Sequence, residues 1–104
     1  MNLKMGARYF SQACDTEVIV VKAPTGDVLL SCAGQPMLDG AARQTATARL
    51  EPVAEWLGGS ALGKRYADAA GSIELLVVKP GAGTLALDGT ALQARTARAL
   101  PSSD

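Results

Sequence analysis

The chain has 104 residues, with ten basic and ten acidic side chains and a formal net charge of zero. Its Lys and Arg residues are scattered, which argues against a nucleic-acid surface, and its longest aliphatic run, residues 18–21, is too short to cross a membrane. Histidine is absent, which removes the commonest general base and nitrogen ligand for metals. Residues 1–5 contain no apolar stretch of signal-peptide length. We therefore expect a cytoplasmic protein whose two cysteines are reduced, with no nucleic-acid or membrane partner.

The first predicted strands lie between residues 8 and 32. Glu17–Lys22 contains four β-branched residues in succession, which favours a strand, and a short extended segment at residues 8–10 precedes it. Residues 23–27 carry Pro and Gly in turn-forming positions. We therefore expect residues 28–32 to return beside Glu17–Lys22 as a β-hairpin.

The middle of the chain has two parts. Residues 39–47 are small, polar and basic, which predicts a linker. Residues 50–57 have apolar side chains at helical spacing, with Pro52 in the first turn and Gly58 after the end, so we expect a short helix there. Trp56 has two interpretations: it caps the sheet core, or it is an interface residue that anchors a protein partner.

The last third of the chain repeats the plan of the first. Residues 73–79 are predicted to be a strand, residues 80–83 a turn, and residues 84–87 a returning strand. Asp88-Gly89 favours a two-residue type I′ turn, which would fold residues 90–93 against residues 85–87. Residues 94–104 show no periodicity and are expected to form a loose tail.

The two segments can be aligned as an internal repeat. Residues 6–34 fall on residues 63–91 without a gap, and the cysteines are not repeated, because Cys14 falls on Gly71 and Cys32 on Gly89. The identical pairs are Gly6/Gly63, Arg8/Arg65, Tyr9/Tyr66, Ala13/Ala70, Glu17/Glu74, Val20/Val77, Val21/Val78, Lys22/Lys79, Gly26/Gly83 and Leu30/Leu87. A unit of about 30 residues rarely folds alone, so we expect the copies to share a core. The recurring Glu and Lys predict reciprocal contacts between them.

Cys14 and Cys32 are the residues with the most obvious chemistry. They bracket the first predicted hairpin, so both sulfurs could face one point. The residues leave three alternatives open: small inert thiols, a disulfide and ligands of a metal. A catalytic thiol has little support, because no His is available to activate it. Arginines that flank the copies, among them Arg43 and Arg49, are expected to stay in solvent.

The segments around these cysteines resemble a known family. Residues 9–18 read Tyr-Phe-Ser-Gln-Ala-Cys-Asp-Thr-Glu-Val, and residues 30–37 read Leu-Ser-Cys-Ala-Gly-Gln-Pro-Met. They are similar to the desulforedoxin module, which is also the N-terminal domain of desulfoferrodoxins in the rubredoxin-like group. The resemblance matches Cys14 and Cys32 to the second and third of four thiolate ligands of iron or zinc. Ser11 replaces the first and Ala33 the fourth, so it implies a metal site that has lost half of its ligands.

Together, these observations predict a mainly β protein. It consists of two small rubredoxin-like β-hairpin modules related by internal duplication and linked by a short helix. Residues 1–40 form the module with Cys14 and Cys32, residues 41–60 the linker, and residues 61–104 the second copy and tail, within one compact unit.

The expected function is that of a small non-catalytic accessory protein, without catalytic residues, which binds a protein partner or a second copy of itself. One alternative is a module that binds zinc or iron, or exchanges thiols, through Cys14 and Cys32, alone or shared across a homodimer. Another is a small subunit of a larger enzyme. No cofactor is expected for the accessory protein, and only the metal-binding alternative implies zinc or iron, at low occupancy.

Overall fold

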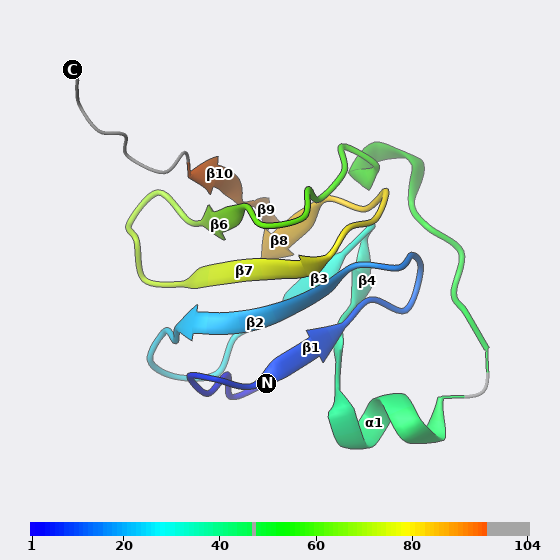
Figure 1. Ribbon diagram of the computed structural model, residues 1–104, viewed down its shortest axis with the longest axis horizontal. Coiled ribbons are helices and arrows are strands. Elements are labelled where there is room, and N and C mark those ends of the chain that lie inside the picture. Colours follow the sequence, from blue (N-terminus) through cyan, green and yellow to red (C-terminus); the bar gives the residue numbers. More distant parts are fainter. Residues whose placement is uncertain (47, 96–104) are drawn as a thin grey trace.

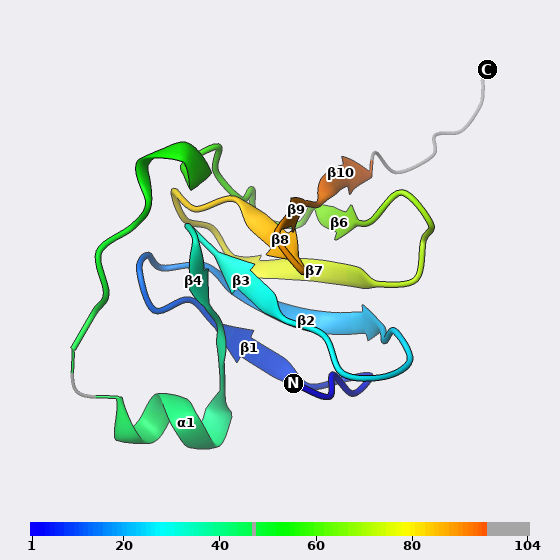
Figure 2. The ribbon, with the colours of Figure 1, turned by 180° about the vertical axis from the view of Figure 1, so that it is seen from behind.

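The computed structural model describes residues 1–46 and 48–95, which form two antiparallel β-sheets in two layers (Figures 1 and 2). The larger sheet has the order β10-β6-β7-β2-β1-β5 and the smaller sheet the order β4-β3-β8-β9. The prediction of a mainly β protein is confirmed. The strands are β1 (Arg8–Phe10), β2 (Glu17–Lys22), β3 (Leu30–Cys32), β4 (Gln35–Pro36), β5 (Leu38–Asp39), β6 (Arg65–Ala67), β7 (Glu74–Lys79), β8 (Leu85–Leu87), β9 (Thr90–Ala91) and β10 (Gln93–Arg95).

The hydrophobic core lies between the two sheets. Strands β2 and β7 alternate buried and half-buried side chains, as expected for a sheet with one face on the core. The fully buried side chains of both sheets meet there, and they are aliphatic or sulfur-containing rather than aromatic. They include Val18, Val20, Leu30, Cys32, Met37, Ile73, Leu75, Val77 and Leu85.

The predicted hairpins between consecutive long strands are wrong. Strand β2 pairs with β1 and β7, whereas β3 pairs with β4 and β8. The segment after β2 therefore crosses from the larger sheet to the smaller one instead of turning back beside its own strand. This crossing lets the aliphatic faces of both sheets cover each other, which buries more apolar surface than a flat hairpin can.

The two halves of the chain meet at the centre of both sheets. In the larger sheet β2 pairs with β7, where Glu17 lies opposite Lys79 and Lys22 opposite Glu74. The predicted contacts between Glu and Lys are therefore confirmed only as opposite positions on paired strands. The two carboxylates form ion pairs with arginines instead, Glu17 with Arg8 at 3.8 Å and Glu74 with Arg65 at 3.0 Å. In the smaller sheet β3 pairs with β8. Each half thus supplies the central partner of the other.

The gapless alignment of the two halves holds only as far as β2 and β7. The backbone N–H of Gly6 donates to the carbonyl oxygen of Val20, and the equivalent bond in the second half joins Gly63 to Val77, so equivalent residues are 57 positions apart. After the chain has crossed to the smaller sheet, equivalent residues are 55 positions apart. There the N–H of Met37 donates to the carbonyl oxygen of Leu30, and the equivalent bond joins Leu92 to Leu85. The left-handed turn residues agree, with Ala33-Gly34 matching Asp88-Gly89. The counterpart of Cys32 is therefore Leu87 and not Gly89, and Leu30/Leu87 is not an equivalent pair.

The middle segment reverses the predicted order of linker and helix. The helix α1 (Gly40–Thr45) occupies the predicted linker, capped by Asp39, whose side chain accepts from Ala42 N at 2.8 Å. The predicted helix at residues 50–57 is only a 3-10 turn, η1 (Ala54–Trp56). Pro52 has no amide proton, and Leu50, Val53 and Leu57 remain 37–45% exposed, so a longer helix would gain no packing.

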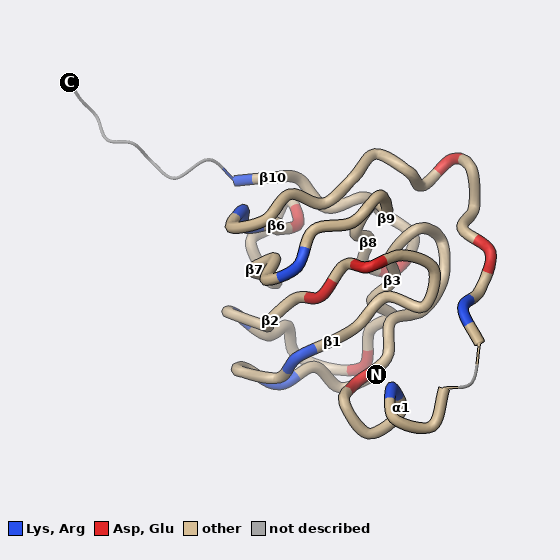
Figure 3. The backbone as a smooth tube through the Cα atoms, turned by 45° about the vertical axis from the view of Figure 1, so that its right-hand side comes forward, with Lys and Arg blue, Asp and Glu red and all other residues tan. Residues whose placement is uncertain are grey.

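The start of the predicted tail forms a strand instead. Residues 94 and 95 belong to β10, which pairs with β6, and Gln93 pairs there too rather than with β8. The rest of the predicted tail, residues 96–104, lies outside the described residues. In the part that the structure describes, no helix is long and apolar enough to span a membrane. Basic and acidic positions are interspersed along both halves (Figure 3).

Candidate functional site

The structure brings the two cysteines together. Cys14 lies in the turn between β1 and β2, Cys32 is the last residue of β3, and their sulfurs are 3.7 Å apart. Both are free thiols, Cys14 partly exposed and Cys32 fully buried. A disulfide needs a sulfur–sulfur distance of about 2.05 Å, so the sulfurs need to approach by about 1.7 Å. The prediction that both sulfurs face one point is confirmed, although it rested on a hairpin that does not form.

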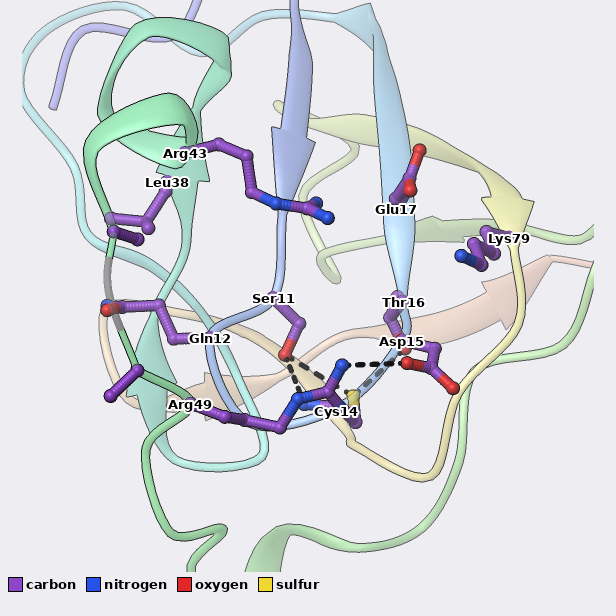
Figure 4. Close-up of a pocket in the computed structure, with 12 residues that line it drawn as sticks. Ser11, Gln12, Cys14, Asp15, Thr16, Glu17, Leu38, Arg43, Arg49 and Lys79 are labelled. Carbon is purple, nitrogen blue, oxygen red and sulfur yellow. Dashed lines mark hydrogen bonds and ion pairs between the residues drawn. The ribbon is translucent and has the colours of Figure 1, made fainter.

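Ser11 organises the turn that holds Cys14. Its side-chain oxygen accepts hydrogen bonds from the backbone N–H groups of Ala13 and Cys14, both at 3.1 Å, and from the Cys14 thiol at 3.3 Å, a bond that must reverse when Cys14 ionises (Figure 4). A hydroxyl that accepts two bonds still has its own proton to donate. Ser11 is therefore placed to donate a hydrogen bond to a Cys14 thiolate.

A chain of hydroxyl groups supports the sulfur from the other side. Thr16 Oγ1 lies 3.2 Å from Cys14 Sγ and 2.9 Å from Ser60 Oγ, which in turn donates to the carbonyl oxygen of Gly83 at 2.6 Å. Because Ser60 uses its only proton for that carbonyl, Thr16 donates to Ser60 while Cys14 is a thiol, and it can donate to a Cys14 thiolate only if the Thr16–Ser60 bond reverses. Ser11 is then the hydroxyl that is free to stabilise a thiolate.

A glycine loop, residues 80–83, packs directly over the two sulfurs. A Cβ atom on Gly81 would lie 2.2 Å from Thr16 Oγ1 and 3.1 Å from Cys14 Sγ. A Cβ atom on Gly83 would lie 2.7 Å from Cys32 Sγ and 2.8 Å from the backbone nitrogen of Ala33. Ser60 and Gly81 exchange backbone hydrogen bonds that fix the loop. The second half of the chain thus supplies the cover of a site whose sulfurs belong to the first half.

The two thiols differ in acidity. Burial opposes ionisation of Cys14, but hydrogen bonds from the side chains of Ser11 and Thr16, with backbone groups of Thr16 and Gly83, outweigh it and lower the pKa of Cys14 from 9.0 to about 7. Burial, followed by the charge of Cys14, raises the pKa of Cys32 to about 11. The first proton of the pair therefore leaves from Cys14, and the Cys32 thiol can donate to the resulting thiolate.

Cys14 also lines an open cleft of about 260 Å³ between the start of β2, the segment after α1 and the end of β7 (Figure 4). Arg43, Arg49 and Lys79 contribute three cationic side chains to its lining, and Asp15 and Glu17 contribute two carboxylates. Arg49 donates to Asp15 at 2.9 Å. The sequence assigned Arg43 and Arg49 to solvent, and nothing in their spacing indicates that they lie beside Cys14.

The residues at the site do not fit a four-ligand iron or zinc centre. Ser11, Cys14 and Cys32 converge, but Ala33, at the fourth position of the resemblance, carries no donor atom. Among the described residues, no three Cys, His, Asp or Glu side chains come close enough together to hold a metal ion. Mononuclear iron–sulfur and structural zinc sites take four ligands. We therefore derive no chemistry through a metal at this site.

Trp56 does not cap the sheet core, and its role as an interface residue stays a prediction. It is half-buried in η1 and is not one of the core side chains. Its ring lies next to Gly34, where an added Cβ would come within 3.2 Å of Trp56 Cδ1. Trp56 therefore covers the turn after β3, which carries Cys32.

The comparisons with known proteins add no relative. No family model matches the chain, and no curated protein and no solved structure matches it either.

Proposed function

We propose that the protein is a thiol–disulfide redox module in which Cys14 is the attacking thiol and Cys32 the resolving thiol. The observation that carries this proposal is the 3.7 Å separation of the two sulfurs, one in an open cleft and the other buried behind it. Reactive cysteines are partly exposed thiols with a lowered pKa, and Cys14 meets both conditions. Ser11 takes the activating role that the absence of histidine leaves open.

The reaction balances without a cofactor. The Cys14 thiolate attacks one sulfur of a disulfide, forms a mixed disulfide and releases the other half as a thiolate, which takes a proton from solvent. Cys32 then loses its proton to solvent, attacks Cys14 Sγ and releases the second half as a thiol. The disulfide gains two electrons, and the protein is left with a Cys14–Cys32 disulfide. A dithiol reductant reverses both steps.

A redox titration tests this function. Purified protein is equilibrated with dithiothreitol at increasing ratios of oxidised to reduced reagent, and its free thiols are counted by alkylation and intact mass. We expect one reversible two-electron transition of the monomer, which disappears in Cys14→Ser and in Cys32→Ser. Two thiols that stay free under oxidising conditions, or disulfides formed only between chains, would contradict the function.

We also propose that the two halves are duplicated rubredoxin-like modules, in which the thiol pair is what remains of a metal site. The symmetric strand orders of both sheets support a duplication, and the resemblance of residues 9–18 and 30–37 supports the kind of module. On this proposal, the exchange of Cys for Ser11 and Ala33 changed a metal-binding site into a redox pair.

Binding of a protein partner is a second candidate function. The observation that favours it is the row of exposed apolar side chains, Leu50, Val53 and Leu57, beside Trp56. It predicts that Cys14→Ser and Cys32→Ser leave folding and binding intact, whereas Leu57→Ser weakens binding. A partner or second copy identified by cross-linking and mass spectrometry provides the assay, and equal binding by Leu57→Ser would contradict it.

A further inference from the structure

The cleft beside Cys14 has an excess of positive charge. Its two carboxylates are already paired, Asp15 with Arg49 at 2.9 Å and Glu17 with Arg8 at 3.8 Å. Among the described residues, Arg43 and Lys79 have no such ion pair. Arg43 instead lies over the Phe10 ring, with its guanidinium carbon 4.7 Å from the ring centroid, a contact that orients the cation without neutralising it. Two cations are therefore free to meet a ligand.

Arg49, the third cation of the cleft, can leave its ion pair with Asp15 at little cost in stability. Arg49 and Asp15 are each about 60% exposed, at 59% and 61%, and exposed ion pairs of this kind contribute little to stability. Figure 4 shows the Arg49 side chain extending past Cys14 to reach Asp15. An anionic group that enters the cleft can therefore compete with Asp15 for Arg49, in the same cleft that Cys14 lines.

Building on the exchange reaction proposed above, on which this step depends, we infer that the cleft selects low-molecular-weight disulfides that carry carboxylate groups. A volume of about 260 Å³ admits a small molecule rather than a folded protein surface. The disulfide sulfur would approach Cys14, and the carboxylates would be bound by Arg43, Lys79 and, after displacement of Asp15, Arg49. The products are two carboxylate-bearing thiols and the Cys14–Cys32 disulfide.

Three small disulfides of similar size and different charge provide the test. Reduced protein is mixed with the disulfide of mercaptopropionate, which is anionic, of mercaptoethanol, which is neutral, or of mercaptoethylamine, which is cationic. The rate of Cys14 oxidation is divided by the rate of the same disulfide with free dithiothreitol, which removes differences in intrinsic reactivity. We expect the normalised rate to be roughly tenfold higher for the anionic than for the cationic disulfide. The difference should shrink in about 1 M salt, where charges are screened within about 3 Å.

Charge variants separate this selectivity from the underlying reaction. Lys79→Gln and Arg43→Gln should each lower the rate with the anionic disulfide by roughly threefold, and Asp15→Asn should raise it. Lys22→Gln is the matched control, because Lys22 has the same strand position as Lys79 but lies outside the cleft. Equal normalised rates for all three disulfides, or an equal loss in Lys22→Gln, would overturn the selectivity and leave the redox function standing. If none of the disulfides oxidises the pair, the redox function itself fails.

Discussion

Ser11 is the residue on which the chemistry of the site depends most. Its hydroxyl accepts two backbone N–H groups and has a proton to spare, whereas the proton of Thr16 is used toward Ser60. In the resemblance to desulforedoxin, Ser11 stands where a thiolate ligand is expected. On the proposed origin of the site from a metal-binding module, the residue that takes the place of a ligand would also supply a hydrogen-bond donor to the Cys14 thiolate.

The rate of alkylation of Cys14 should report this stabilisation. In the Cys32→Ser background, the rate with iodoacetamide is expected to rise with pH around a midpoint of about 7 rather than 9.0. Adding Ser11→Ala should move the midpoint upward, because the thiolate loses its free donor. Thr16→Val serves as the comparison and should move it less. A larger shift in Thr16→Val would show that Thr16, and not Ser11, donates to the sulfur.

The two thiols should also give the reduced protein an unusual dependence of stability on pH. Between pH 7 and 9 the folded state has released the Cys14 proton that the unfolded chain still holds, so the free energy of unfolding rises with pH. Between pH 9 and 11 the folded state keeps the Cys32 proton that the unfolded chain loses, so the free energy of unfolding falls with pH. Denaturant titrations at each pH measure this. Cys14→Ser should abolish the rise, and Cys32→Ser should reduce the fall, part of which remains because burial also raises the pKa of Tyr9 above 10.0. A rise that persists in Cys14→Ser would contradict the assignment.

At the scale of elements, the glycine loop at residues 80–83 should tolerate no side chain at Gly81 or Gly83. Gly83→Ala places a methyl group 2.8 Å from both the backbone nitrogen and the Cβ atom of Ala33, so the loop must shift. We expect a loss of about 2 to 3 kcal/mol in the free energy of unfolding, measured by denaturant titration. Gly40→Ala is the control, because an added Cβ there meets no atom within 4 Å and Gly40 opens α1. Its stability should be unchanged or slightly higher. Equal stability of the two variants would show that the loop is not packed on the sulfurs.

The sequence predicted elements well where the signal is local. The β-branched run of Glu17–Lys22 and the Asp88-Gly89 turn both lie where they were expected. The predicted pairing of the first long strand with the segment after it was wrong. Strand β2 pairs with β7 and not with β3, because this arrangement buries the apolar faces of both sheets, and no local pattern in the sequence encodes that burial. The helix α1 was missed because none of its six residues is buried, so its sequence shows no apolar periodicity.

The candidate site was predictable only in part. The approach of Cys14 and Cys32 was expected from their position around the first strands. The glycine loop and Lys79 come from the other half of the chain, some 50 residues away, and Arg43 and Arg49 come from the segment between. No sequence spacing brings these parts together, because their proximity results from the β2–β7 pairing.

The molecule as a whole combines a nearly symmetric scaffold with an asymmetric site. Ile19 lies opposite its counterpart Leu76 in one sheet, and Ser31 opposite its counterpart Ala86 in the other, so an approximate two-fold axis passes through both sheets. At the positions equivalent to Cys14 and Cys32, the second half has Gly71 and Leu87. One half therefore holds the thiols, while the other supplies the glycine loop that covers them.

Because the central strand pairs join the two halves, they should unfold together. Val18 and Val77 are register partners, 0% and 1% exposed. Val18→Ala and Val77→Ala should each lower the free energy of unfolding by about 1 to 3 kcal/mol, since each leaves a cavity in the shared core. Val53→Ala, at an exposed position, is the control and should change it by less than about 0.5 kcal/mol.

The cooperativity of this unfolding is the decisive measurement. Trp56 fluorescence follows the region around the Cys32 turn, and far-ultraviolet circular dichroism follows both sheets. In the wild type and in each core variant, the two signals should change at the same denaturant concentration, as in a two-state transition. If the halves were independent modules, Val77→Ala would destabilise the second half alone, and the circular dichroism would then show an earlier transition than the fluorescence. A single shifted transition in both variants is expected, because each half without the other would expose the apolar faces of β2 and β3 or of β7 and β8.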